Sequence, residues 1–232
     1  MIPLKDTIRT NKVPIINWLI ILTNVFAFLY ESSLSQSGLK SFIQTYALIP
    51  AMFQMNDPST WTPLLSHMFL HGSWMHLLSN VWILFIFGDN LEAQMGSLRY
   101  LFFYLIGGFV AAFIQMIFTN DPTLPTLGAS GAIAAVMGAY FLLFPTARVV
   151  TFIPVFFLPW IVEIPAIIYL GIWFASQLWS GLTSMVSASA SVGGVAWWAH
   201  IGGFAFGLLI SSSLLRTQQK QNPYPINPYP KT

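Results

Sequence analysis

Long apolar stretches, separated by short polar or Gly/Pro-rich segments, constrain this 232-residue chain more than any other feature. Six of them approach the roughly 20 residues that a helix needs to cross a bilayer. Their apolar runs are continuous, without the alternation typical of membrane strands, which disfavours a β-barrel. The sequence therefore predicts an all-α polytopic membrane protein, a bundle of six transmembrane helices over 14–30, 74–87, 100–118, 127–144, 160–179 and 195–215.

Composition supports this fold class and excludes several functions. Only 7% of the residues are charged, against about a quarter in soluble domains, so membrane lipids must cover most of the surface. The net charge of +2 without basic runs argues against a nucleic-acid partner. The absence of cysteine excludes disulfides, thiolate metal sites and a cysteine nucleophile.

The positions of the cations predict the orientation, because Lys and Arg in short loops stay on the cytoplasmic side. With six spans and the N-terminus inside, eight of the nine Lys and Arg residues lie inside and only Lys40 lies outside. This favours an N-in, C-in topology. It divides the chain into a cytoplasmic segment (1–13), a membrane domain (14–216) and a disordered cytoplasmic tail (217–232), with a flexible outside cover at 180–194.

All four histidines fall on the outer side in this topology. His76 and Asn80 are four residues apart, so on a helix they project from the same face. We expect His67 and His71 to make hydrogen bonds that hold the first outside segment to the second span. The spacing of these histidines is only a weak zinc pattern without an HExxH motif or nearby carboxylate, and we predict no metal site. His200 stands alone at the outer end of the sixth span.

The sequence Gly128-Ala-Ser130-Gly131 opens the fourth predicted helix. A serine at a helix start ordinarily acts as a cap. The flanking glycines, however, would let a substrate or another backbone approach closely. The free N–H groups and the helix dipole at this end would also stabilise an oxyanion. Ser130 is therefore also a candidate nucleophile.

Small residues predict how Ser130 could meet a base. The fourth predicted helix carries a small residue at every fourth position, from Ser130 through Ala134 to Gly138. The sixth carries Gly203 and Gly207 on the same face as His200. Faces of this kind let membrane helices pack closely. If the two faces meet, the Ser130 hydroxyl and His200 come together as an activated serine requires. Because no acidic residue is expected at that depth, we predict a dyad, with oxyanion donors from the Ser130 amide and the side chains of His76 and Asn80.

Together these motifs resemble the signature of the rhomboid intramembrane serine proteases, in their compact bacterial six-helix form, over nearly the whole chain. The resemblance implies Ser130 as nucleophile and His200 as general base, with no cofactor. It implies an oxyanion hole of His76, Asn80 and the Ser130 amide. The remaining site residues that it implies have structural roles and are His67, His71, Gly128, Gly131, Gly203 and Gly207.

The resemblance also implies partners and location. The substrates would be transmembrane segments of other proteins, cut near the outer surface through an acyl-enzyme after movement of the fifth span. The protein would lie among the lipids of a plasma membrane, namely the bacterial inner membrane. The resemblance implies no oligomeric state. Glu92, Gly96 and Ser97 match a structural pattern of the family.

Two positions depart from the family pattern. Ala134 stands where some members carry an aromatic residue that stacks on the catalytic histidine, and Thr62 follows Trp61 where many have Trp-Arg. The alternatives are an inactive rhomboid-like protein that binds membrane helices, a small transporter or channel, and a purely structural membrane protein. The presence of both Ser130 and His200, and the clustering of polar groups at one depth, favour the protease.

Overall fold

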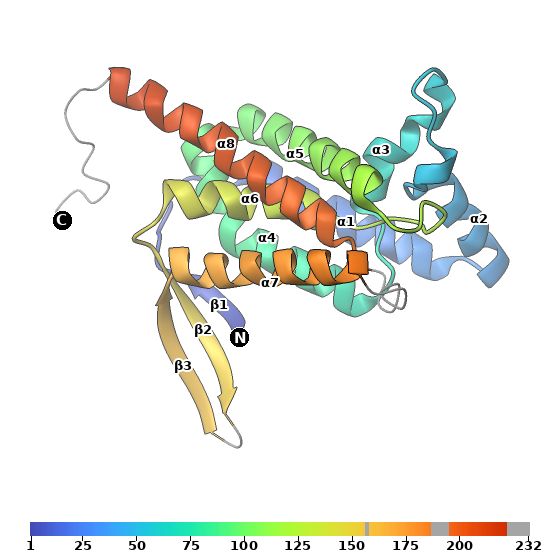
Figure 1. The fold of residues 1–232 in the computed structure, drawn as a ribbon. Helices are drawn as coiled ribbons and strands as arrows, with labels where there is room; N and C mark the ends of the chain where they lie inside the picture. The colour runs from blue at the N-terminus through green and yellow to red at the C-terminus, as the bar shows by residue number, and fades with distance from the viewer. Residues whose placement is uncertain (156–157, 187–194, 222–232) are drawn as a thin grey trace.

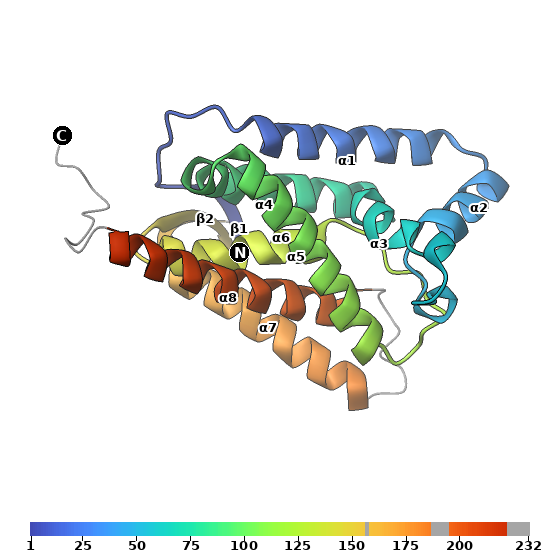
Figure 2. The same cartoon turned by 90° about the horizontal axis from the view of Figure 1, so that it is seen from above.

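The computed structural model describes residues 1–155, 158–186 and 195–221, and it is mostly helical (Figures 1 and 2). A helix occupies most of each of the six predicted apolar stretches. The central one is α6, which contacts four other helices and is buried at every residue from Gly131 to Tyr140. The six helices are α1 (Ile15–Ser33), α4 (Trp74–Met95), α5 (Ser97–Phe118), α6 (Ser130–Leu143), α7 (Ala166–Val186) and α8 (Trp197–Gln221).

Length and hydropathy identify fewer membrane spans than six among the described residues. The helices α1, α5 and α7 are long and apolar enough to cross a bilayer. A fourth span is possible if the segments Pro58–Phe69 and Trp74–Met95, which meet at a bend of 78°, are counted together. The central α6 is apolar but has only 14 residues. The protein is thus a helical, multi-pass membrane protein, while the six-span count and the N-in, C-in orientation stay predictions.

Between α1 and α4 the chain folds into short helices beyond one end of the bundle (Figure 2). Ser35 caps the first of them by accepting a hydrogen bond from the Gly38 amide at 3.2 Å. Ser73 caps α4 in the same way, through the His76 amide. The short helices are α2 (Gln36–Tyr46), η1 (Pro50–Met52), η2 (Pro58–Thr60), α3 (Thr62–Ser66) and η3 (His67–Phe69).

The predicted start of the fifth helix at residue 160 is wrong. The strands β2 (Arg148–Val155) and β3 (Leu158–Pro165) pair there, and β1 (Ile2–Asp6) joins them in an antiparallel sheet of order β1-β2-β3. Figure 1 shows the sheet projecting away from the helices. Because proline has no amide hydrogen and clashes inside a helix, Pro165 at the end of β3 delays α7 until Ala166.

Two further boundaries differ from the sequence prediction. The helix α7 continues to Val186, so residues 180–186 are helical and not part of a flexible cover; the rest of that predicted cover, 187–194, lies outside the described residues. The helix α8 continues to Gln221, past the predicted beginning of the tail at 217. The remainder of the predicted tail, 222–232, also lies outside the described residues.

A buried carboxylate joins the start of α1 to the end of α4. Pro14 at the N-cap of α1 provides no side-chain cap. Glu92 supplies one, because its carboxylate accepts from the amides of Ile16 and Asn17 at 3.1 and 2.8 Å. The Ser97 hydroxyl donates to the same carboxylate at 2.5 Å. The intervening Gly96 has φ +83°, a left-handed conformation that glycine adopts without strain.

Candidate active site

The predicted contact between the fourth and sixth helices is present, and it is made by backbone. A Cβ atom placed on Gly207 of α8 would lie 2.8 Å from the Ala139 nitrogen and 2.9 Å from the Ala135 carbonyl carbon of α6. A Cβ atom on Gly203 would lie 3.1 Å from the Gly131 carbonyl carbon. These distances leave no room for a side chain, so the two helices touch as the small residues predicted.

This packing brings the starts of α6 and α8 together. Ser130 is the first residue of α6 and is partly buried. The next residue, Gly131, lies against Ala199: a Cβ atom built on it would be 3.6 Å from the Ala199 Cβ. Ala199 precedes His200, so the two candidate catalytic residues lie in adjacent turns of contacting helices. The capping interpretation of Ser130 is not supported, because Ala129 holds the N-cap position.

Gly128 connects this region to α4. Its φ of +123° is in the left-handed region, which favours glycine. A Cβ atom there would lie 2.6 Å from His76 Nε2 and 3.7 Å from Asn80 Nδ2. The side chains of His76 and Asn80 therefore face the backbone two residues before Ser130. Both side chains thereby lie beside the amide end of α6, where a developing oxyanion could be stabilised.

His71 makes hydrogen bonds that hold the outer segment to α4 and α1. Its Nε2 accepts from Asn80 Nδ2 at 3.0 Å, while its Nδ1 donates to the Phe69 carbonyl. Its backbone amide donates to the Glu31 carboxylate of α1. The ring also packs edge-on against His76, with 5.1 Å between the centroids. His71 thus positions the Asn80 amide as well as the loop.

His67 has a similar role in the loop. Its Nδ1 donates to the Pro63 carbonyl at 2.8 Å, and its own carbonyl accepts from the Gly128 amide at 2.8 Å. The second bond ties the outer segment to the glycine next to the candidate site. Within the part of the chain that the structure describes, no three His, Cys, Asp or Glu side chains gather as a metal site would require.

The structure adds a residue that the sequence prediction missed. Gln177 of α7 places its Oε1 at 2.7 Å from Nδ1 of His200. Trp173, one turn earlier on the same helix, has its ring centroid 5.8 Å from that of His200. The only sequence signal was an isolated glutamine in an apolar stretch, four residues after a tryptophan. Trp197 also meets the histidine, edge-on at 6.2 Å.

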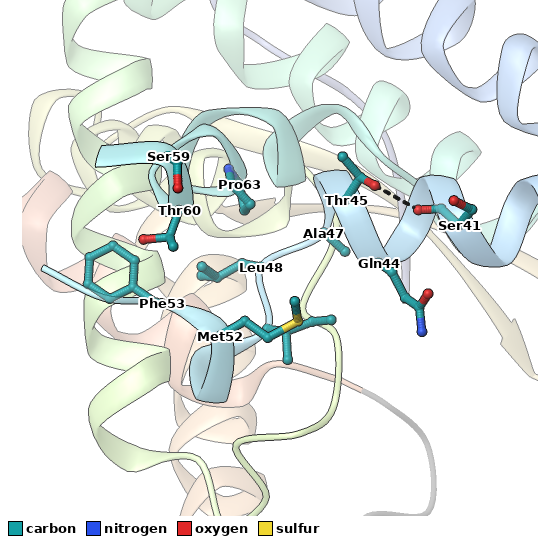
Figure 3. Close-up of a pocket in the computed structure, with 11 residues that line it drawn as sticks. Ser41, Gln44, Thr45, Ala47, Leu48, Met52, Phe53, Ser59, Thr60 and Pro63 are labelled. Carbon is teal, nitrogen blue, oxygen red and sulfur yellow. Dashed lines mark hydrogen bonds between the residues drawn. The ribbon is translucent and has the colours of Figure 1, made fainter. Parts of the chain in front are cut away.

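A separate pocket of about 330 Å³ lies in the outer segment, between the end of α2, η1, η2 and the start of α3 (Figure 3). Figure 3 shows Thr60, Phe53 and Leu48 among the side chains that line it. None of the candidate catalytic residues lines this pocket. We therefore do not assign it to the chemistry of Ser130.

Comparison with known proteins shows the family. The profile of the Rhomboid domain family matches residues 58–217, more than half of the chain. The chain is 29% identical to the rhomboid protease GlpG of Haemophilus influenzae over 123 residues, which cover 53% of this chain and 60% of that protein. It is 30% identical to RHOMBOID-like protein 4 of Arabidopsis thaliana over 157 residues, 66% of this chain and 34% of that protein.

A mitochondrial relative is also similar. Rhomboid protein 1 of Saccharomyces cerevisiae is 25% identical over 187 residues, 78% of this chain and 48% of the yeast protein. The chain thus spans less than two thirds of the length of these relatives. The matched region contains every candidate catalytic and oxyanion-hole residue described above. On its helical membrane fold and this match, the chain belongs to the rhomboid family.

Proposed function

We propose that the protein is an intramembrane serine endopeptidase that uses Ser130 as nucleophile and His200 as general base. Rhomboid family members are generally intramembrane serine proteases. The observation that carries the proposal is the backbone contact between α6 and α8, which brings the beginnings of the two helices together. Both catalytic residue types are present at these positions, which argues against an inactive relative.

In the proposed reaction the Ser130 hydroxyl attacks the scissile carbonyl carbon while His200 accepts its proton. The carbonyl oxygen becomes an oxyanion, for which the Ser130 amide and the side chains of His76 and Asn80 are the proposed donors. His200 then protonates the leaving amine as the peptide bond breaks. Water hydrolyses the resulting acyl-enzyme, with His200 again as the base.

The proposed substrates are transmembrane segments of other proteins, cut near the outer membrane surface. The helical membrane fold supports a substrate that enters from the bilayer. We further propose the bacterial inner membrane as the location, with the six-span, N-in and C-in topology and a membrane domain over 14–216. A mitochondrial relative such as the yeast protein makes an organelle membrane the alternative location.

Cleavage by the purified protein in proteoliposomes tests the proposal. The wild type should cut a transmembrane reporter and react with a fluorophosphonate probe. Ser130→Ala should lose the probe label and reduce cleavage by about 10⁴-fold or more, since removal of a nucleophile has effects of this size. Ser212→Ala is the matched control, because this hydroxyl on α8 is only partly buried and, among the described residues, bonds its own helix at the Leu209 carbonyl.

The results separate the proposed function from its alternative. Labelling and cleavage that survive in Ser130→Ala would refute the assignment of the nucleophile. A wild type that binds the reporter without cutting it would instead support an inactive, helix-binding rhomboid. Cleavage should be insensitive to chelators, because no step of the proposed reaction requires a metal.

A further inference from the structure

A buried glutamine in α7 lies against the proposed base. Gln177 is only 6% exposed although it belongs to a helix that is long and apolar enough to cross the membrane. A primary amide in such a place is costly unless its donors and acceptor are bonded. Its hydrogen bonds therefore define both its orientation and what it can do for its neighbours.

The donors of the amide are directed toward its own helix. Nε2 of Gln177 lies 2.9 Å from the Ser176 hydroxyl and 3.3 Å from the Trp173 carbonyl. The Ser176 hydroxyl itself donates to the Trp173 carbonyl at 2.6 Å, so its oxygen remains available to accept from Nε2. With the NH₂ group engaged in this way, the carbonyl oxygen of the amide faces His200.

The contact between that oxygen and the histidine determines where the imidazole proton resides. An amide oxygen has no hydrogen to donate, so at 2.7 Å the His200 Nδ1 must be the donor. A neutral imidazole carries one N–H, and a proton on Nδ1 leaves Nε2 with a free lone pair. That is the tautomer in which Nε2 can accept a proton from a serine.

Aromatic rings hold the same histidine on two sides. The Trp173 ring is tilted by 37° to the imidazole, and the Trp197 ring meets it at 89°. Ala134 of α6 is fully buried and supplies no ring. The orientation of His200 thus depends on α7 and on the first turn of α8.

We propose that Gln177 is a positioning residue, which holds His200 in the Nδ1–H tautomer and leaves Nε2 as the base for Ser130. The inference rests on the proposed Ser130–His200 chemistry. Because the glutamine is neutral, it acts by orientation and supplies no charge to the imidazolium that forms during the reaction. We therefore expect a smaller contribution than the roughly 10⁴-fold effect of a charged triad partner.

The kinetic test compares three variants of α7 in proteoliposomes. Gln177→Met keeps the size of the side chain but has no strong acceptor, and should lower kcat about 10- to 100-fold with KM unchanged, short of the effect of losing a charged partner. Gln177→Glu keeps an oxygen acceptor and should recover most of this loss. Thr183→Val, a polar-to-apolar change whose hydroxyl bonds only α7, should retain the wild-type kcat. An unchanged kcat in Gln177→Met would overturn the proposal.

A spectroscopic test does not depend on activity. ¹⁵N spectra of histidine-labelled wild-type protein should show His200 protonated at Nδ1, identified by subtraction of the spectrum of His200→Ala. Subtraction is needed because His67 and His71 also donate from Nδ1. In Gln177→Met the His200 signals should shift toward the Nε2–H tautomer. A wild-type His200 protonated at Nε2 would overturn the proposal.

These outcomes also separate the inference from the proposed function. If the wild type cuts no reporter but shows the Nδ1–H tautomer, the proposed catalysis fails while the hydrogen bond to Gln177 stands. If it cuts normally but Gln177→Met matches it in kcat and in ¹⁵N shifts, only the positioning role fails.

Discussion

The pair α6–α8 and the neighbouring helix α7 are built in opposite ways. In the pair, glycine and alanine allow backbone to touch backbone, as at Gly207, and ten successive residues of α6 from Gly131 to Tyr140 are buried. The helix α7 exposes large apolar side chains such as Ile172 and Trp179. It contacts the bundle through a narrower set of residues that includes Leu170 and Gln177.

This difference separates two requirements of the proposed site. Packed backbones have no side-chain rotamers to change, so α6 and α8 can keep Ser130 and His200 in register. Side chains at the surface of a bundle can repack at lower cost, which makes α7 the easier helix to displace. The placement of the proposed nucleophile thus depends on the pair, and the orientation of the proposed base depends on α7 and on Trp197 of α8.

The largest effect on stability is expected when a methyl group is added at the contact between α6 and α8. Gly207→Ala would place its Cβ 2.8 Å from the Ala139 nitrogen and 2.9 Å from the Ala135 carbonyl carbon, so whole helices must move apart. We expect a loss of about 1–3 kcal/mol, as for other overpacked interiors. Unfolding in detergent by denaturant titration would measure it. A variant as stable as the wild type would show that α6 and α8 can accommodate a methyl group, and hence that the pair is not packed more tightly than α7.

A smaller, pH-dependent effect is expected where α6 is tied to the sheet. Asp6 of β1 accepts hydrogen bonds from Tyr140 of α6 and Asn90 of α4, at 2.5 and 2.7 Å. Burial, together with the negative charge of the neighbouring Asp89, raises the pKa of Asp6 to about 6, although the hydrogen bond from Tyr140 lowers it. Because the pKa of Asp6 in the folded protein lies above the ordinary value of 3.8, the native state favours the protonated acid, and stability should fall as pH rises from about 4 through 6.

Asp6→Asn tests this link, because asparagine keeps an acceptor oxygen and does not titrate. Thermal unfolding between pH 4 and 7 should lose this part of its pH dependence in the variant. The effect should stay below that of Gly207→Ala, since Asp6 is only partly buried and solvent screens it. A pH profile identical to that of the wild type would show that Asp6 does not carry the dependence.

The smallest effect is expected from a glycine-to-alanine substitution in α7. A Cβ atom on Gly171 would meet only the Phe141 ring, at an ordinary contact distance of 3.7 Å. Alanine is the better helix former, so Gly171→Ala should be neutral or stabilising by up to about 1 kcal/mol. The same denaturant titration measures it, with Gly207→Ala as the matched comparison. A loss as large as that of Gly207→Ala would mean that α7 is packed as tightly as the pair.

Sequence reasoning predicted much of the fold because helix-forming apolar stretches and small-residue spacing are local signals. The i, i+4 spacing of His76 and Asn80 placed both side chains on one face, and both face Gly128 in the structure. The glycines of α8 predicted the contact with α6. The catalytic roles of Ser130 and His200 stay predictions.

What the sequence reasoning missed depends on pairing across the chain. The apolar run from residue 160, which contains Pro165, predicts a helix start, whereas strand pairing with residues 148–155 satisfies the backbone there. The partner of His200 was missed because its identity depends on the rotation of α7 about its axis. A lone glutamine in an apolar segment does not reveal which neighbour accepts from it or donates to it.

The hydrogen bond from His200 to Gln177 has a consequence for the order of events in a catalytic cycle. The acceptor belongs to α7 and the donor to α8, so the bond exists only while these two helices are side by side. If α7 swings aside to admit a substrate, the base loses its orienting partner at that moment, and it regains it when the helix returns. This coupling would keep Ser130 unactivated while α7 is displaced. It would delay cleavage until the helix has closed over the substrate.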